Sequence, residues 1–230
     1  MSKHLTLAEL QAHLPEILDS PKNGGVVRGI VIRPAAGGRR DLASSEISLA
    51  GGVHGDHWAK GCWKSTEAGL PHPDVQICIM NARCIAAIAQ ERENWPPAGD
   101  NLFIDMDLTP DNMPPGQRLA IGSAIIEITA TAHNGCASFI ARYGRDACLF
   151  VNTGEGKRLR LRGIYARVVQ DGKVSVGDSV TKIKMIEANR EHLDDIADLD
   201  LAEKRLIEIR EGKVRTIRLD EVMKRHGVED

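Results

Sequence analysis

The sequence lacks a long hydrophobic run and has few aromatic residues. No apolar stretch in its 230 residues reaches the length that spans a bilayer, and the segment MSKHLTLAEL lacks the continuous apolar core of a signal peptide. These absences predict a cytoplasmic protein with no membrane partner. Aromatic residues make up 3% of the chain, and all of them fall between Trp58 and Tyr165. We therefore expect a core module followed by a segment of a different kind.

A strong excess of charge of one sign is also missing. Lys and Arg number 30 against 32 Asp and Glu, which gives a formal net charge of -2. This balance argues against a nucleic-acid partner, because general affinity for nucleic acid needs a clearly basic surface. Any anion site must therefore be local. The hydrophobic content of 42% is enough for one core of ordinary size.

The five cysteines form neither a C-x-x-C pair nor an even-numbered framework, so free thiols in a reducing compartment are expected. Cys78, Cys84 and Cys148 lie in apolar runs typical of a core, and Cys62 lies in a predicted loop. Cys136 differs because it lies in a polar turn, HNGCASF, directly after the strand-like run AIIEITATA. Thiol reactivity depends on thiolate character and access, which makes Cys136 the predicted functional cysteine.

The pattern of residues 1–183 predicts a mixed α/β fold that is mostly β. Thr6 and Glu9 form a capping-box pattern, which predicts an N-terminal helix over residues 6–19 with a break near Pro15. A second helix is expected in NARCIAAIAQERE. Strands are predicted in VVRGIVIRP, PDVQICIM, NLFIDM, RLAIG, AIIEITATA, GIYARVV and KVSVGDSVTKI. Many short strands separated by turns favour a barrel-like domain.

A hairpin and a charged tail complete the predicted elements. The pair Asp171-Gly172 between GIYARVV and KVSVGDSV predicts a hairpin, because an Asp-Gly turn supplies the positive φ angles that twisted strands need. Residues 184–230 form a charged tail, for which we expect a helix from about 186 to 211, a strand in GKVRTIRL and a short helix in DEVMKRHG. We interpret the tail as an interaction or dimerisation arm, which would make the protein a homodimer, or as a plain helical appendage.

Arginines are dense after Cys136. They are Arg142, Arg145, Arg158, Arg160, Arg162 and Arg167. If KRLRLRG is a strand, three of these side chains lie on one face and form an array suited to phosphate or carboxylate. The alternative is an edge strand whose arginines face water.

Two further polar groups could serve a site. His54, Asp56 and His57 in GGVHGDHW are brought close together by a glycine turn, which indicates either a metal site such as zinc or hydrogen bonding within the loop. Asn101 in AGDNLFIDM lies where a predicted strand begins. Its amide either binds a ligand or locks the turn.

Seven of these segments, taken in order, resemble the MOSC domain, the family named after the C-terminal part of molybdenum-cofactor sulfurases. They are SPKNGGVVRGIVIRP, GGVHGDHW, PDVQICIM, the G-D-N-L box at Gly99 to Leu102, PGQRLAIGSAIIEIT, Cys136, and RGIYARVVQDGKVSVGDSV. The resemblance covers about residues 20–183. It implies a barrel-like, mostly β domain and a stand-alone bacterial member, because no pyridoxal-phosphate desulfurase region precedes it and no cysteine-rich iron-sulfur segment follows.

The resemblance also implies a function, because the family is associated with molybdenum ion binding and with pyridoxal phosphate binding. In the leading interpretation Cys136 is the metal ligand of a molybdenum-pterin cofactor. Arg145, Arg160, Arg162 and Asn101 would bind the cofactor, and His54, Asp56 or His57 would supply protons for reduction of an N-hydroxylated small-molecule substrate. An electron-donor protein would then be a partner.

Two alternatives stay open. Cys136 could carry a persulfide sulfur received from a cysteine desulfurase and pass it to an acceptor. The barrel could also be a non-catalytic binding module with no chemistry at the thiol.

Overall fold

The fold is built mainly from strands. The computed structural model describes residues 4–35 and 37–183. The strands are β1 (Gly25–Ile32), β2 (Arg40–Leu42), β3 (Ser44–Ser48), β4 (Gly52–Val53), β5 (Ile77–Asn81), β6 (Leu102–Asp105), β7 (Arg118–Ile121), β8 (Ala124–Ala132), β9 (Ile164–Gln170), β10 (Gly172–Ser175) and β11 (Ser179–Ile183). The helices are α1 (Leu7–Ala12), α2 (Leu14–Leu18), α3 (Ala82–Ala89), α4 (Ala137–Asn152) and α5 (Gly154–Arg158), with 3-10 turns η1 (Trp58–Lys60), η2 (Pro73–Val75), η3 (Arg92–Asn94) and η4 (Pro96–Ala98). The predicted fold class, mixed but mostly β, is confirmed.

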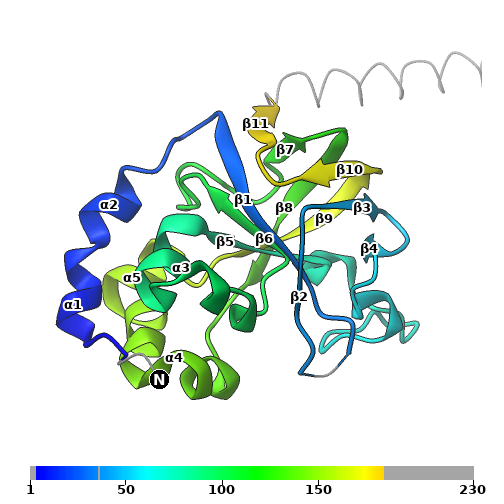
Figure 1. Cartoon of the computed structure of the whole chain (residues 1–230). Helices are drawn as coiled ribbons and strands as arrows, with labels where there is room; N and C mark the ends of the chain where they lie inside the picture. Colours follow the sequence, from blue (N-terminus) through cyan, green and yellow to red (C-terminus); the bar gives the residue numbers. More distant parts are fainter. Residues whose placement is uncertain (1–3, 36, 184–230) are drawn as a thin grey trace, which may run out of the picture. The chain divides into compact units, whose positions relative to one another are not determined.

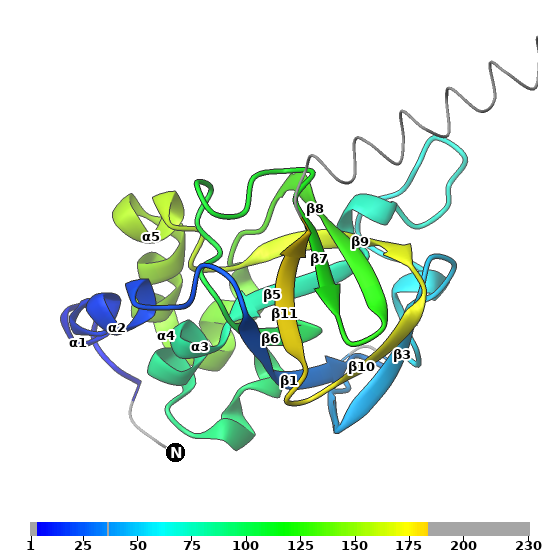
Figure 2. The ribbon, with the colours of Figure 1, turned by 90° about the horizontal axis from the view of Figure 1, so that it is seen from above.

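Seven of the strands close into a barrel, which Figure 2 shows from above. Their order is β11-β7-β8-β9-β5-β6-β1, and β1 pairs again with β11, where Gly25 lies opposite Val180. Strands β5 and β6 are parallel, and the other barrel pairs are antiparallel. Closure satisfies the strand edges that an open sheet would expose. The barrel-like domain expected from the sequence is therefore present.

Apolar side chains fill the barrel, and helices cover part of its outer surface. Along β5, Ile79 belongs to the core inside the barrel, whereas the next residue, Met80, belongs to the cluster beneath the helices. Phe103 of β6 contributes to the same outer cluster. Figure 1 shows the five α-helices gathered on this side of the strands. Cys84 of α3 and Cys78 of β5 are both buried, as the sequence predicts.

Strands β9 and β10 do not pair, so the predicted Asp171-Gly172 hairpin is wrong. β9 pairs with β5 and β8, whereas β10 joins β3 and β4 in a separate three-stranded sheet. Gly172 does not adopt a positive φ. Its backbone packs closely against the chain at Ser123, where an added Cβ would lie 2.4 Å from the carbonyl carbon. The Asp171 carboxylate accepts a hydrogen bond from the Leu49 N–H, so contacts with distant residues set this turn.

The N-terminal helical region begins as predicted. The Thr6 hydroxyl accepts a hydrogen bond from the Glu9 N–H, and the Glu9 carboxylate accepts one from the Thr6 N–H, which completes the capping box. Pro15 lies in the first turn of α2. Residues 6–19 therefore form two short helices with the predicted break near Pro15, because proline cannot continue the hydrogen-bond ladder of α1.

The segment KRLRLRG is not a strand, which corrects the prediction of three arginines on one face. Its first residues end α5, and the following residues form a turn in which Arg160 has a φ of 54°. The Gly163 N–H closes the turn by donating a hydrogen bond to the Arg160 carbonyl oxygen. A Cβ added to Gly163 would lie 2.1 Å from the Ile79 carbonyl oxygen. Close approach of this turn to β5 therefore overrides the alternating basic and apolar pattern.

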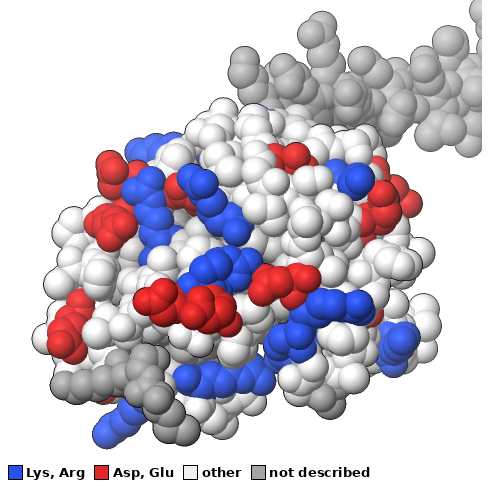
Figure 3. Space-filling model, viewed as in Figure 1, with Lys and Arg blue, Asp and Glu red and all other residues white. Residues whose placement is uncertain are grey.

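Charges of both signs alternate on the face shown in Figure 3. This agrees with the formal net charge of -2. None of the helices in the described residues is both long and apolar enough to cross a membrane. The chain divides after Ile183. The elements predicted for the tail, 184–230, lie outside the described residues.

Candidate functional site

A buried hydrogen-bond network joins Arg33, just after β1, to Asp56 and Asn101. The Arg33 Nε and Nη2 atoms each lie 3.0 Å from an Asp56 carboxylate oxygen, and Nη2 lies 3.1 Å from Asn101 Oδ1. The Asn101 amide nitrogen donates to Asp56 and to the Val31 carbonyl oxygen, while Oδ1 also accepts the Cys78 N–H. These bonds occupy both polar atoms of the Asn101 side chain. They support the turn-locking interpretation of this residue over ligand binding.

Asp56 is held as a carboxylate. Its burial would raise its pKa, but the hydrogen bonds and positive charge of Arg33 outweigh that effect and lower it. The Trp58 N–H also donates to this carboxylate, at 3.0 Å. An ionised carboxylate only accepts hydrogen bonds. The geometry therefore favours a structural role for Asp56 over the proton-donor role predicted from the sequence.

The two histidines of GGVHGDHW do not form a metal site with Asp56. His57 Nδ1 lies 2.9 Å from the Arg33 carbonyl oxygen and 3.6 Å from the Asp56 carboxylate, and His54 is exposed. Throughout residues 4–35 and 37–183, no group of three or more His, Cys, Asp or Glu side chains could hold a metal ion. The zinc interpretation is unsupported, and the contact of His57 Nδ1 with the Arg33 carbonyl oxygen, outside the loop, accounts for the position of the ring.

Asp100 and Arg162 form a second buried pair next to this network. Asp100 is fully buried and Arg162 is 7% exposed. Arg162 Nη1 lies 3.0 and 2.9 Å from the two Asp100 oxygens, Nη2 donates to the Ala98 carbonyl oxygen, and the guanidinium lies 4.9 Å from the Phe139 ring centroid. Burial would lower the pKa of Arg162, but the charge of Asp100 raises it above its usual value. Arg162 is therefore a buried, paired cation, and not a phosphate ligand facing solvent.

His133 lies against the same pair and was not singled out from the sequence. Its Nδ1 lies 3.7 Å from Asp100, is buried and has no hydrogen-bond partner. Its ring centroid lies 4.3 Å from that of Tyr165. Burial first, and then the charges of Arg162 and Arg33, hold the pKa of His133 well below its usual range. The ring is therefore a neutral imidazole at physiological pH. The one sequence feature that could have identified His133 as a site residue is its position three residues before Cys136.

Cys136 is exposed, and the other four cysteines, all in the described part, are buried or half-buried. It occupies the N-cap position of α4, although its thiol makes no capping hydrogen bond. Partial burial opposes ionisation, but the N–H groups of Phe139 and Ser138 in the first turn, together with Arg162, lower the thiol pKa below that of ordinary cysteine. The accessibility predicted for this thiol is confirmed.

The lowered pKa gives Cys136 a testable reactivity. Its alkylation by iodoacetamide should continue at pH values where an ordinary cysteine, with a pKa near ~8.5, is largely protonated, because the thiolate is the reactive form. The rate at Cys136 should be measured by mass spectrometry as a function of pH, with the unstructured peptide HNGCASF as the control. Equal midpoints in the protein and the peptide would contradict the assigned environment.

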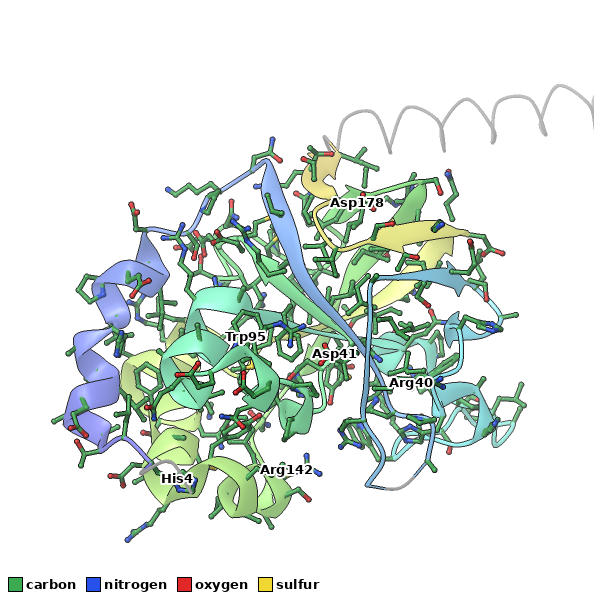
Figure 4. All side chains as sticks on the ribbon, in the orientation of Figure 1. His4, Arg40, Asp41, Trp95, Arg142 and Asp178 are labelled. Carbon is green, nitrogen blue, oxygen red and sulfur yellow. The ribbon has the colours of Figure 1, made fainter. Side chains whose placement is uncertain are left out.

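Three arginines gather around Gly99. A Cβ added to Gly99 would lie 3.4 Å from Arg39 Nη2 and 3.9 Å from Arg142 Nη1, and Arg33 donates to the Gly99 carbonyl oxygen at 3.2 Å. Burial lowers the pKa of Arg39, and the charges of Arg142 and Arg33 lower it further. Arg39 Nε is buried without a hydrogen-bond partner. Figure 4 shows Arg142 at α4, on the side that faces β2. The carboxylates of Asp56 and Asp100 offset part of this repulsion, and a bound anion would offset the rest.

The remaining predicted arginines have separate surroundings. Arg145 is exposed on α4, and Arg158 is exposed at the end of α5. Arg160 is half-buried and donates to the Met113 carbonyl oxygen at 2.8 Å. The structure therefore does not bring Arg145 and Arg160 together with Arg162. The arginines that do converge, Arg33, Arg39 and Arg142, are hereafter called the Gly99 arginine cluster.

The fold and these side chains define a closed-barrel protein with one exposed thiol at a helix N-terminus and a nearby cluster of arginines. The family model of the MOSC domain matches residues 50–181, which is more than half of the chain. The chain belongs to the MOSC domain family, a family associated with binding of the molybdenum cofactor.

Solved structures with a similar fold include YUAD from Bacillus subtilis, at 18% identity and a TM-score of 0.47, over 69% of this chain and 95% of that one. YiiM from Escherichia coli is similar at 19% identity and a TM-score of 0.45, over 69% of this chain and 70% of that one. YiiM from Geobacillus stearothermophilus has 13% identity and a TM-score of 0.39, over 71% and 75% of the two chains. No curated protein sequence matches the chain.

Proposed function

We propose that this MOSC protein binds a molybdenum-pterin cofactor through Cys136 and reduces an N-hydroxylated small molecule. The observation that carries the proposal is an exposed thiol of lowered pKa, placed on the same helix segment as Arg142 of the Gly99 arginine cluster. Cys136 and Arg142 are separated by six helical positions, or about 9 Å along the axis. Six positions also rotate the two side chains about 120° apart, so one ligand that contacts both would extend along α4 and partly around it.

The donor set suits the metal of this cofactor. A thiolate is a soft ligand, which matches a metal already bound by sulfur atoms of the pterin. Cys136 supplies one such ligand, and its lowered pKa makes the thiolate more available than in an ordinary cysteine. When bound, the molybdenum centre would supply the two-electron reduction. Cys136 would anchor it to the N-terminus of α4.

The Gly99 arginine cluster suits the anionic part of the cofactor. Arg39 Nε is buried and has no partner, and the repulsion from Arg142 and Arg33 lowers the pKa of Arg39. A phosphate there would accept hydrogen bonds from guanidinium groups and offset their mutual repulsion. Arg162 would act indirectly, because it is paired with Asp100 and adds positive charge near Cys136.

Protons for the reaction are proposed to enter through histidine and not through Asp56. His54 is exposed and His57 is half-buried, so solvent reaches either ring. His133 is neutral and buried, and its unpartnered Nδ1 would orient the substrate or cofactor by hydrogen bonding. Asp56 remains bonded to Arg33 and holds the loop that carries His54 and His57.

A sulfur carrier is the second candidate function, favoured by the exposure of Cys136. Its thiolate would attack the terminal sulfur of a cysteine desulfurase persulfide, forming a persulfide on Cys136 and releasing the thiolate of the desulfurase. An electron-donor protein is the proposed partner in the first function, and the desulfurase is the proposed partner in the second.

Elemental analysis of the protein purified from a host that makes the cofactor tests the first function. We expect close to one molybdenum atom per chain, together with the pterin. Purified protein without molybdenum, which gains the mass of one sulfur atom when mixed with a desulfurase and cysteine, would establish the carrier instead. A protein that shows neither property would contradict both functions and leave the binding module.

A further inference from the structure

A cavity of about 180 Å³ lies beside β8, and His133 of the candidate site is one of its lining residues. Its walls are the segment Thr129–Asn134, which ends β8 and leads toward Cys136, one residue each of α4, α5 and β9, and the turn between α5 and β9. Neither the thiol nor the Gly99 arginine cluster lines it. We call it the β8 cavity.

The cavity opens because β8 bulges away from β9. Ile128 lies opposite Ala166 and Ala132 lies opposite Ile164, so β8 places three residues where β9 places one, Tyr165. A bulge of this kind interrupts the hydrogen-bond ladder and bends the strand. The Thr129 hydroxyl donates to the Asp74 carbonyl oxygen, which fixes the bulged segment. The space is therefore a built feature of the barrel wall.

Positive charge lines the β8 cavity. Lys157 is exposed at its wall, and Arg160 is half-buried there in a left-handed backbone conformation that a non-glycine residue rarely adopts. Lys64 Nζ, outside the cavity, lies 3.2 Å from the hydroxyl oxygen of the wall residue Thr131 and 4.0 Å from the Asp74 carboxylate, with which it pairs. No Asp or Glu lines the cavity, and in the described part of the chain neither Lys157 nor Arg160 forms an ion pair.

The available donors match a tetrahedral oxyanion. Arg160 donates from Nη1 to the Met113 carbonyl oxygen. None of its other guanidinium nitrogens is a buried donor that lacks a partner. His133 and Asn134 add polar groups from the loop before Cys136. Arginine offers a planar fork of donors to phosphate, and lysine adds a point charge. A cavity of about 180 Å³ has room for a phosphate group and a few additional atoms.

We propose that the β8 cavity is a second ligand site that binds a phosphate group, next to the site around Cys136 and distinct from the Gly99 arginine cluster. The phosphate would lie between Lys157 and Arg160, with the bulged segment of β8 behind it. The same segment continues through His133 into Cys136, so the ligand would contact the chain that positions the thiol.

Isothermal titration calorimetry of the full chain with inorganic phosphate at low salt tests the site. Lys157→Gln should weaken binding about tenfold, the value of one charge-assisted hydrogen bond. Arg158→Gln is the matched control, because Arg158 is a neighbouring α5 cation that pairs with Glu155 and does not line the cavity. It should leave phosphate affinity unchanged. Arg39→Gln should weaken only phosphate binding at the Gly99 arginine cluster, so this variant identifies any binding event that belongs to that site.

Three results would overturn the proposal. They are absence of phosphate binding by the wild-type chain, equal losses in Lys157→Gln and Arg158→Gln, and a loss confined to Arg39→Gln. Lys157 is exposed, so its replacement should not unfold the protein, and circular dichroism checks this directly. Repeating the titration with glycerol phosphate shows whether the bound phosphate group belongs to a larger molecule or is free phosphate. Tighter binding supports a phosphorylated metabolite as the ligand, and equal affinity supports free phosphate.

Discussion

Cys136→Ser is expected to abolish retention of molybdenum, and equally persulfide formation, while changing the free energy of unfolding by less than about 0.5 kcal/mol. Serine lacks the thiolate that both proposed functions need. The fold should tolerate it because Cys136 is exposed and makes no capping hydrogen bond, and serine is a favourable N-cap residue. Metal content, intact mass and urea unfolding of the purified variant measure the three quantities.

Two other cysteines serve as controls. Cys148→Ser alters a half-buried thiol on the same helix and should retain full metal or sulfur content. Cys84→Ser should retain the chemistry but lower stability, since Cys84 is fully buried among apolar side chains. Wild-type metal and sulfur content in Cys136→Ser would refute the role of this thiol in both functions.

Arg162→Met is expected to lower the free energy of unfolding by about 3–5 kcal/mol, because it leaves the Asp100 carboxylate buried without its partner. Burial already raises the pKa of Asp100, against the opposing charges of Arg162, Arg33 and Arg39. In the variant the carboxyl pKa should rise further above its unfolded value. The penalty should therefore be smallest at low pH, where Asp100 is protonated, and grow as pH rises.

The double variant Arg162→Met with Asp100→Asn separates charge from packing. Removing the stranded carboxylate should recover part of the lost stability, measured by urea unfolding at pH 7. Arg145→Gln is the control for loss of one positive charge, since Arg145 is exposed on α4, and it should be near neutral. A double variant no more stable than Arg162→Met would show that the buried charge is not the cause.

Local patterns predicted the elements whose stability is local. The capping box of Thr6 and Glu9 and the strand AIIEITATA could be read directly, because their signals lie within a few residues. The hairpin at Asp171-Gly172 could not, because β10 finds its partner in β3, more than a hundred residues earlier. In KRLRLRG, alternation indicated a strand, yet the chain must turn sharply at Gly163 to fit against β5. Propensity is a weak guide where distant packing decides.

The site was predictable only in part for the same reason. Cys136 could be found because its exposure follows from a polar turn after a strand. Arg33 and Arg39 could not, since they lie a hundred residues before the thiol and meet Arg142 only once the barrel forms. From its residue type Asp56 could be a proton donor. Only its pairing with Arg33, which the sequence does not show, identifies it as a carboxylate held in the ionised form.

Closure of the barrel has a consequence for how the chain folds. Strand β1 is completed by β11, which pairs Gly25 with Val180 at almost opposite ends of the described sequence. Bringing such distant segments together costs loop-closure entropy before the contacts that offset this cost can form. We therefore expect slow folding, with β1–β11 pairing late. During synthesis, one edge of β1 would stay unpaired until residue 183 has left the ribosome. A chain truncated before Ser179 should therefore expose that edge and aggregate.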